Sequence, residues 1–182
     1  MLTKKMESTL VKHINKEMHS GYIYMAMSTH SASIGLKGFA AWFMSQYHEE
    51  MFHAMKMVEY VQSHGGDIKL TAIEDPLGGF KSPLDMFEKT LGHEQYMTDN
   101  INKLVDLAIE EKDHASQIFL HWYVTEQVEE EDSVNDILAR LKLIGKDANA
   151  LLTIDKELGT RGVTVPTDFS TSVTAQAKAA KA

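Results

Sequence analysis

Four long stretches of this chain place their core-type residues alternately three and four positions apart, which is the spacing of one face of an α-helix. Proline, the strongest helix breaker, occurs only at positions 76, 83 and 166 and so interrupts none of these stretches. The pattern predicts four amphipathic helices of about 27 to 32 residues, each about 40 Å long or more. The four stripes are Leu10, Ile14, Glu17, Gly21, Tyr24, Ser28; Phe39, Phe43, Gln46, Glu50, His53, Met57, Tyr60 or Val61; Leu84, Phe87, Leu91, Glu94, Thr98, Ile101, Val105, Ala108; and Leu120, Tyr123, Gln127, Glu130, Val134, Ile137, Leu141, Ile144.

The segments between the stripes suggest how the helices are connected. Ser82 is a suitable N-cap for the third helix, with Pro83 at its first helical position. Residues 65–81 are too many for a helix-helix turn of about 2 to 8 residues, and we interpret them as a crossover between two helical hairpins. A short fifth helix is expected over 147–158. The sequence thus predicts an all-α four-helix bundle with a long crossover and a short fifth helix.

The chain length of 182 residues is consistent with one main domain, predicted over 1–159, followed by a tail over 160–182. The tail is small and polar without a periodic apolar face, and it is expected to be mobile. No run approaches the ~18 apolar residues of a membrane span, and the first 25 residues do not resemble a signal peptide. A cytoplasmic protein with no membrane partner is the simplest interpretation.

Charge and cysteine usage exclude several functions. The formal net charge is -8, which argues against unassisted binding of nucleic acid. Cysteine is absent, so disulfide scaffolds, thiol nucleophiles and cysteine-ligated clusters are excluded. Any metal must be held by oxygen and imidazole.

Each of the four stripes carries one glutamate where an apolar residue is expected: Glu17, Glu50, Glu94 and Glu130. A buried carboxylate is costly unless its charge is compensated. Glu17 and Glu50 lie at similar distances from the first predicted turn, and Glu94 and Glu130 lie at similar distances from the second. The four carboxylates are therefore expected to converge in the middle of the bundle. A single such glutamate is more often a surface residue whose position has been misassigned, but four in register require a common counter-charge.

Two further polar residues lie one helical turn from these glutamates. His53 follows Glu50 at i, i+3, and Gln127 precedes Glu130 at the same spacing. Converging carboxylates with one imidazole suit two divalent ions that share a bridging ligand, and the oxygen-rich set favours iron or manganese. Zinc would also bind by affinity alone, so the ligand set does not decide the metal.

At these residues the sequence resembles the non-haem ferritins of bacteria, over roughly residues 1 to 160. The resemblance rests on KEMHSGYIYMAMS, YHEEMFHAMKM, GHEQ, FLHWYVTEQVEEE and IDKEL. Bacterioferritins and rubrerythrins repeat Glu-x-x-His on two helices, whereas the second copy here reads Gln127-x-x-Glu130. Haem is not expected, because the 11 methionines of a helix-rich chain more often fill gaps in the core.

The resemblance implies a role for each of these residues. One iron would be held by Glu17, Glu50 and His53, and the other by Glu50 as a bridge together with Glu94 and Glu130. Gln127 would lie beside the second iron, and Tyr24 corresponds to a tyrosine near the centre. Read without the resemblance, Tyr24 is a core aromatic with a hydrogen-bonded hydroxyl.

A second acidic cluster consists of Glu49, Glu126 and Glu129. Read from the residues alone, it is a solvated acidic face. The resemblance implies instead that these residues, with Glu130, form a third iron site.

The function that the resemblance implies is iron storage with ferroxidase activity. Two ferrous ions would be oxidised by dioxygen, or by hydrogen peroxide, and the ferric product stored as mineral inside a homo-oligomeric shell of about 24 chains. The alternatives are a di-iron or manganese-iron oxidase acting on an organic substrate, a peroxide-scavenging relative that is not a storage shell, and a metal-free structural bundle. The mass of the native particle and its metal content distinguish them.

Overall fold

A computed structural model of the chain describes residues 2–76 and 78–179, and these residues form helices and no strand. The helices are α1 Lys4–Ser33, α2 Lys37–Ser63, α3 Pro83–Glu110, α4 His114–Ile144, α5 Ala148–Leu158 and α6 Val173–Ala179. The four long helices contain 30, 27, 28 and 31 residues, as their stripes predicted. The all-α class and the fifth helix are confirmed, whereas α6 was not predicted.

The predicted start of α3 is confirmed in detail. The Ser82 side chain accepts a hydrogen bond from the Asp85 backbone N–H at 3.1 Å, and Pro83 is the first helical residue. A proline at this position loses no intrahelical hydrogen bond, because the first N–H groups of a helix have no partner within it.

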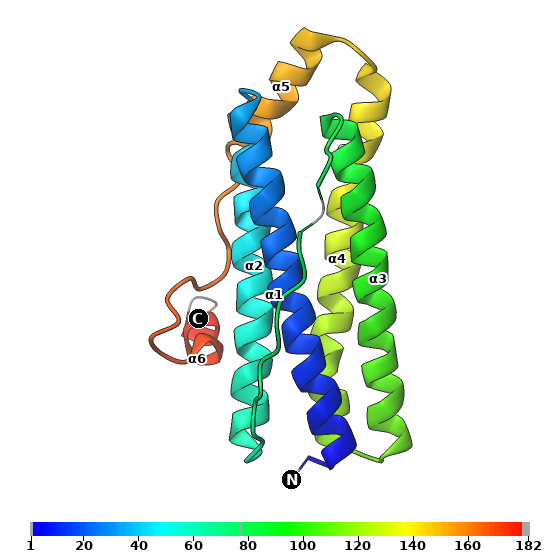
Figure 1. Cartoon of the computed structure of the whole chain (residues 1–182), viewed down its shortest axis with the longest axis vertical. Helices are drawn as coiled ribbons and strands as arrows, with labels where there is room; N and C mark the ends of the chain where they lie inside the picture. The colour runs from blue at the N-terminus through cyan, green and yellow to red at the C-terminus, as the bar shows by residue number, and fades with distance from the viewer. Residues whose placement is uncertain (1, 77, 180–182) are drawn as a thin grey trace. The chain divides into compact units, whose positions relative to one another are not determined.

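Backbone contacts divide the chain into two compact units. One unit contains α1 from Glu7 onward, α2, most of the crossover up to Gly79, α5 from Leu152 onward and α6, and the other contains α3 and α4. Within the first unit, α1 and α2 lie side by side (Figure 1). Ser28 Oγ donates to the Ala40 carbonyl at 2.8 Å, and the Tyr24 and Phe43 rings stack with their centroids 6.3 Å apart.

The predicted crossover after Gly65 is present as non-helical chain that follows α1 (Figure 1). Asn15 Nδ2 donates to the Ala72 carbonyl at 3.1 Å, and His19 Nε2 lies 3.3 Å from the Asp75 carbonyl oxygen. These contacts fix the crossover along the helix that carries Glu17.

Helix α5 docks at the beginning of α2. Asp155 Oδ1 accepts hydrogen bonds from the backbone N–H groups of Gly38 and Phe39 at 2.8 and 3.0 Å. A Cβ on Gly38 would lie 1.5 Å from the Asp155 carbonyl oxygen, so only glycine permits this approach. The carboxylate therefore caps α2, and α5 delivers the tail to the surface of α2.

The second unit is a helical hairpin with a short turn. Lys112 adopts a left-handed conformation (φ 56°), and Asp113 caps α4 by accepting a hydrogen bond from the Ser116 N–H at 3.0 Å. The buried side of α3 is broader than predicted, because it also includes Met86, Met97 and Leu104. In contrast, the predicted stripe members Leu84, Leu91, Thr98 and Val105 are only partly buried. Apolar residues occupy two neighbouring rows of this helix, and periodicity alone does not choose between them.

Candidate metal centre

The first half of the candidate centre lies between α1 and α2. Glu17 comes from α1, and Glu50 and His53 come from adjacent turns of α2. His53 Nδ1 lies 3.8 Å from Glu17 Oε2 and 3.8 Å from Glu50 Oε2. All three side chains are buried, and each contributes one ligand atom to a set whose members lie within 4.8 Å of one another. Two carboxylates and an imidazole at this spacing form a ligand set for a divalent cation.

His13 adds a contact that the sequence analysis missed. It lies four residues before Glu17 on α1, and its Nε2 is 3.0 Å from Glu17 Oε1, with both side chains buried. Burial acts to raise the pKa of the Glu17 carboxyl, but its interactions with His13 and His53 outweigh burial and hold this pKa far below its ordinary value. Glu17 is therefore an ionised carboxylate, with one oxygen oriented by His13 and the other directed toward His53.

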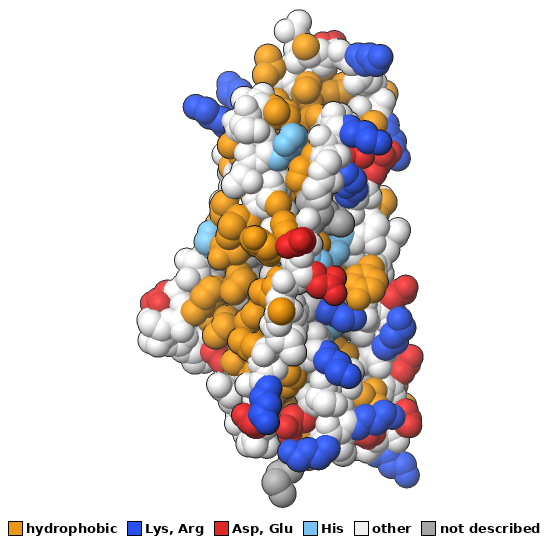
Figure 2. Space-filling model, viewed as in Figure 1, with side chains coloured by type: hydrophobic (Ala, Val, Ile, Leu, Met, Phe, Trp, Pro, Cys, Tyr) orange, Lys and Arg blue, Asp and Glu red, His pale blue; other side chains and the backbone are white. Residues whose placement is uncertain are grey.

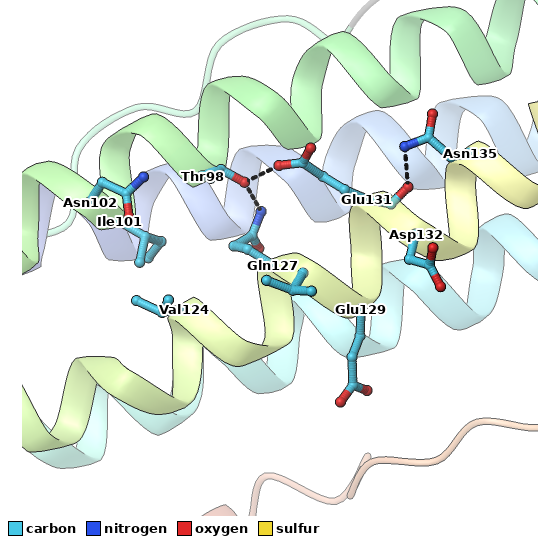
Figure 3. A pocket seen from close by; sticks show the side chains of 10 residues that line it. Thr98, Ile101, Asn102, Val124, Gln127, Glu129, Glu131, Asp132 and Asn135 are labelled. Atoms are coloured by element: carbon cyan, nitrogen blue, oxygen red, sulfur yellow. Dashed lines mark hydrogen bonds between the residues drawn. The ribbon is translucent and has the colours of Figure 1, made fainter.

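The second half lies between α3 and α4. Gln127 Nε2 lies 3.2 Å from the backbone carbonyl oxygen of Glu94, 3.3 Å from Glu94 Oε2 and 3.3 Å from Thr98 Oγ1. Thr98 Oγ1 in turn donates to Glu131 Oε1 at 2.5 Å. Figure 3 shows the part of this chain formed by Gln127, Thr98 and Glu131, which crosses from one helix to the other. The amide of Gln127 thus orients the Glu94 carboxylate, which is only 1% exposed.

Glu130 and Tyr24 are both buried, at 5% and 0% exposure. Glu130 follows Gln127 by one turn of α4, and Tyr24 lies two turns after Glu17 on α1. The structure thus joins Glu17, Glu50 and His53 in one group, and Glu94 with Gln127 in another. That both groups and Glu130 bind one pair of ions stays a prediction.

The three residues of the second acidic cluster have different environments. Glu49 is 4% exposed, so the solvated-face interpretation is wrong for this residue. Its carboxylate is 2.7 Å from Arg161 Nη2, and it accepts a hydrogen bond from Thr164 Oγ1 at 3.2 Å. Glu126 is partly buried and Glu129 is exposed.

Glu129 lines a surface pocket of about 530 Å³ on α3 and α4. In Figure 3 its carboxylate points away from the Thr98–Gln127–Glu131 chain. The other polar residues that line the pocket are Thr98, Asn102, Gln127, Glu131, Asp132 and Asn135. Polar side chains of α3 and α4 therefore extend from this surface toward buried Glu94.

His13 and Arg161 differ in whether a sequence signal could have found them. His13 lies at i-4 from Glu17 and next to the predicted core residue Ile14, so helical spacing could have identified it. Arg161 reaches Glu49 across 112 positions from a segment without periodicity. No local pattern reports such a contact.

Comparison with known proteins adds the family. The model of the ferritin-like domain matches residues 7–144. The chain is 38% identical over 156 residues to a bacterial non-heme ferritin of Campylobacter jejuni, which covers 86% of this chain and 93% of that protein. It is 37% identical over 161 residues to a bacterial non-heme ferritin of Staphylococcus aureus, which covers 88% of this chain and 97% of that protein.

Solved structures agree with the sequence relatives. The open-pore ferritin of the hyperthermophilic archaeon Archaeoglobus fulgidus is 48% identical, with a TM-score of 0.88 over 89% of this chain and 100% of that chain. An engineered closed form of the same ferritin gives a TM-score of 0.89 at 48% identity, over 90% of this chain and 100% of that chain.

Long helices that carry buried carboxylates, together with these similarities, define an all-α protein with the ferritin-like four-helix-bundle fold. The chain belongs to the ferritin family, whose function is iron storage. Within the described residues, none of the helices combines the length and apolar character needed to cross a membrane.

Proposed function

We propose that this protein is an iron-storage ferroxidase, which oxidises ferrous iron with dioxygen at a dinuclear centre and stores the ferric product as mineral inside a homo-oligomeric shell. The observation that carries the proposal is the buried group of Glu17, Glu50 and His53, whose ligand atoms lie within 4.8 Å of one another. In the ferritin family such a group receives iron as substrate and passes it on.

The proposed ligands divide between two ferrous ions. Glu17, Glu50 and His53 hold the first ion, and Glu50 also bridges to the second, which Glu94 and Glu130 hold. Four carboxylates balance the four positive charges of two ferrous ions, which explains why they are tolerated in helix cores. Oxidation raises the charge on iron, and a harder, more highly charged ion gains more from carboxylate ligands, so this set favours the ferric product.

Neighbouring residues prepare these ligands for the substrate. The hydrogen bond between His13 and Glu17 holds one Glu17 oxygen, and the Gln127 amide holds Glu94. Contacts of this kind fix the direction in which a ligand presents its free oxygen. Tyr24 is buried on the same helix as Glu17. Its phenol is proposed to supply an electron when the reduction of dioxygen needs more electrons than the two irons provide.

A third iron site formed by Glu49, Glu126 and Glu129 together with Glu130 is part of the proposal. Glu130 is one of the ligands of the second ion, and a carboxylate has two oxygens with which to contact two metals. Iron leaving the dinuclear centre would pass this way toward the mineral. The buried carboxylate of Glu49 supports a role beyond surface charge.

The proposed assembly is a shell of about 24 identical chains, located in the cytoplasm. A hollow of about 370 Å³ on the α1–α2 unit is lined by Met18, Tyr22, Met25, Tyr47, Met51 and Ile73. Figure 2 shows hydrophobic side chains gathered on this face beside the crossover. Tyr22 and Ile73 are 46% and 43% exposed, and a contiguous apolar surface of this kind favours contact with another copy of the chain.

The ferroxidase activity is tested by stopped-flow oxidation of ferrous iron by the assembled protein. Glu50→Ala removes the proposed bridge and should slow the oxidation of the first two irons per chain more than about tenfold. Glu88→Ala, which removes an exposed glutamate from α3, is the matched control and should keep the wild-type rate. A wild-type rate in Glu50→Ala would contradict the assignment.

The storage function is tested by the mass of the native particle. Light scattering should give a particle of about 24 chains. After loading with iron and removal of the excess, an iron assay should show that this particle retains ferric mineral. A stable monomer or dimer would favour the alternative, an oxidase or peroxide-scavenging relative that forms no shell.

A further inference from the structure

Arg161, which follows α5, brings a positive charge to a buried part of α2. Its Nη2 lies 2.7 Å from Glu49 Oε2, its Nη1 donates to Gln46 Oε1, and its guanidinium lies 5.0 Å from the centre of the Trp42 ring. The Arg161 side chain is 26% exposed, whereas that of Glu49 is only 5% exposed. A charge-assisted contact with this much burial is held more firmly than a surface ion pair.

Both oxygens of the Glu49 carboxylate are engaged by the tail. Arg161 occupies Oε2, and the Thr164 hydroxyl donates to Oε1 at 3.2 Å. The guanidinium therefore supplies the positive counter-charge that a buried carboxylate needs. If Glu49 were a metal ligand, the bound cation would supply this positive counter-charge instead of Arg161.

A second attachment holds the tail further along α2. Glu59 accepts hydrogen bonds from the Val173 N–H at 2.6 Å, the Thr174 N–H at 3.2 Å and the Ser172 hydroxyl at 3.1 Å. Val173 is fully buried. The contact of Asp155 with Gly38 lies before Arg161 in the chain, and the Glu59 attachment lies after it. Arg161 therefore remains close to Glu49 even when the guanidinium releases the carboxylate, and the two can re-form their contact.

We propose that the Arg161 guanidinium competes with a metal ion for the Glu49 carboxylate. A divalent ion on this carboxylate would bring two positive charges next to the guanidinium, and repulsion at such a distance is strong in a partly buried site. Metal binding at Glu49 therefore requires that Arg161 leave, which lowers the affinity of the third iron site relative to the dinuclear centre. This inference rests on the proposed third site, and it assigns the tail the role of setting when that site fills.

The test is an anaerobic titration of the full-length, assembled protein with Fe²⁺ and, separately, with redox-inert Zn²⁺. Arg161→Gln removes the competing charge and should tighten binding of the third ion by about tenfold or more. Arg161→Lys keeps the positive charge but loses the planar guanidinium, and it should give a smaller increase in the affinity for the third ion. Arg140→Gln, which removes an arginine paired with Asp136 at 3.9 Å on α4, is the matched control and should bind as wild type does.

Displacement of the guanidinium is measured separately through Trp42. The measurement uses a Trp122→Phe background, because the chain has two tryptophans and only Trp42 contacts Arg161. With Arg161 intact, the third equivalent of Zn²⁺ should change the Trp42 emission, because the cation above the ring leaves. In Arg161→Gln the same equivalent should leave this emission unchanged. A protein with Arg161 intact that binds a third ion without any change in emission would overturn the proposal.

Glu49→Gln separates failure of the inference from failure of the third site. If Glu49→Gln abolishes the third ion but Arg161→Gln leaves its affinity unchanged or weaker, the third site stands and Arg161 is not a competitor. If Glu49→Gln retains the third ion in both the wild-type and the Arg161→Gln backgrounds, the proposed site is wrong and the inference fails with it. The expected result is that Glu49→Gln cancels the gain seen in Arg161→Gln, while the first two ions bind unchanged.

Discussion

Glu17 illustrates how a carboxylate is kept charged inside a helical core. Its two oxygens face His13 at 3.0 Å and His53 at 3.8 Å, and the side chain is 2% exposed. Interactions with two imidazoles outweigh the cost of burial, so the pKa of Glu17 is lowered. The charge that the proposed iron substrate needs is therefore present before any metal arrives.

The contact with His13 leads to a prediction for the metal-free protein. His13→Leu removes one hydrogen-bond partner of a buried carboxylate, so the pKa of Glu17 should rise and the free energy of unfolding should fall by about 1–3 kcal/mol at pH 7. Because the folded-state pKa of Glu17 lies below its ordinary value of 4.5, its contribution to stability is present above pH 4.5 and declines as the pH falls toward the folded-state pKa.

Urea unfolding of wild type and His13→Leu at several pH values measures this effect. The stability difference between the two proteins should be constant near neutral pH and narrow below pH 4.5. A difference that widens in acid would contradict the role given to His13.

At the scale of elements, the helices were predictable and their long-range contacts were not. Local spacing predicted the long helices, and the Ser82–Pro83 pair predicted the start of α3. The same spacing placed Glu50 and His53 on one face of α2 and Glu17 on the buried face of α1. Periodicity could not decide which of two apolar rows of α3 is buried, because both rows satisfy it. Periodicity also could not predict that the tail binds α2, because the contact between Arg161 and Glu49 depends on tertiary structure alone.

The docking of α5 gives a prediction at Gly38. Gly38→Ala would place a Cβ 1.5 Å from the Asp155 carbonyl oxygen, so α5 must shift and its cap on α2 is disturbed. The free energy of unfolding should fall by about 1–3 kcal/mol. Gly92→Ala is the control, because it lies in α3 with open space around its Cβ and should stabilise the helix by about 0.5–1 kcal/mol. Denaturant unfolding that moves both variants in the same direction would refute this account of Gly38.

The attachment of α6 depends on the charge of Glu59. Partial burial acts to raise the pKa of Glu59, but hydrogen bonds from Thr174, Val173 and Ser172 outweigh it and lower the pKa below 4.5. The attachment should therefore be complete at neutral pH and weaken as the pH falls below 4.5 through the folded-state pKa.

Hydrogen exchange of the backbone amides of 173–179 reports this attachment. Glu59→Gln should speed their exchange already at neutral pH, and wild type should approach the variant in acid. Equal protection of wild type and Glu59→Gln at neutral pH would show that Glu59 does not hold α6.

At the scale of the whole molecule, each unit carries one half of the proposed centre. The unit with α1 and α2 holds Glu17, Glu50 and His53, and the hairpin of α3 and α4 holds Glu94 and Glu130. The four-helix bundle was predictable because the chain has four long helical stripes and because the crossover is too long for a simple turn. The ferritin family followed from the resemblance of the motifs around the four glutamates. Family membership then relates the two halves to iron storage, and the dinuclear centre is the central claim that needs measurement.

Anomalous diffraction from crystals of the assembled protein, loaded with Fe²⁺ without oxygen, tests this claim most directly. The account predicts two strong iron peaks per chain, one contacted by Glu17, Glu50 and His53 and the other by Glu50, Glu94 and Glu130. Glu50→Ala should lose at least one of the two peaks. A weaker third peak at Glu49, Glu126 and Glu129 would agree with the proposed third site. Absence of iron from both predicted positions, or a single peak that does not touch Glu50, would contradict the account.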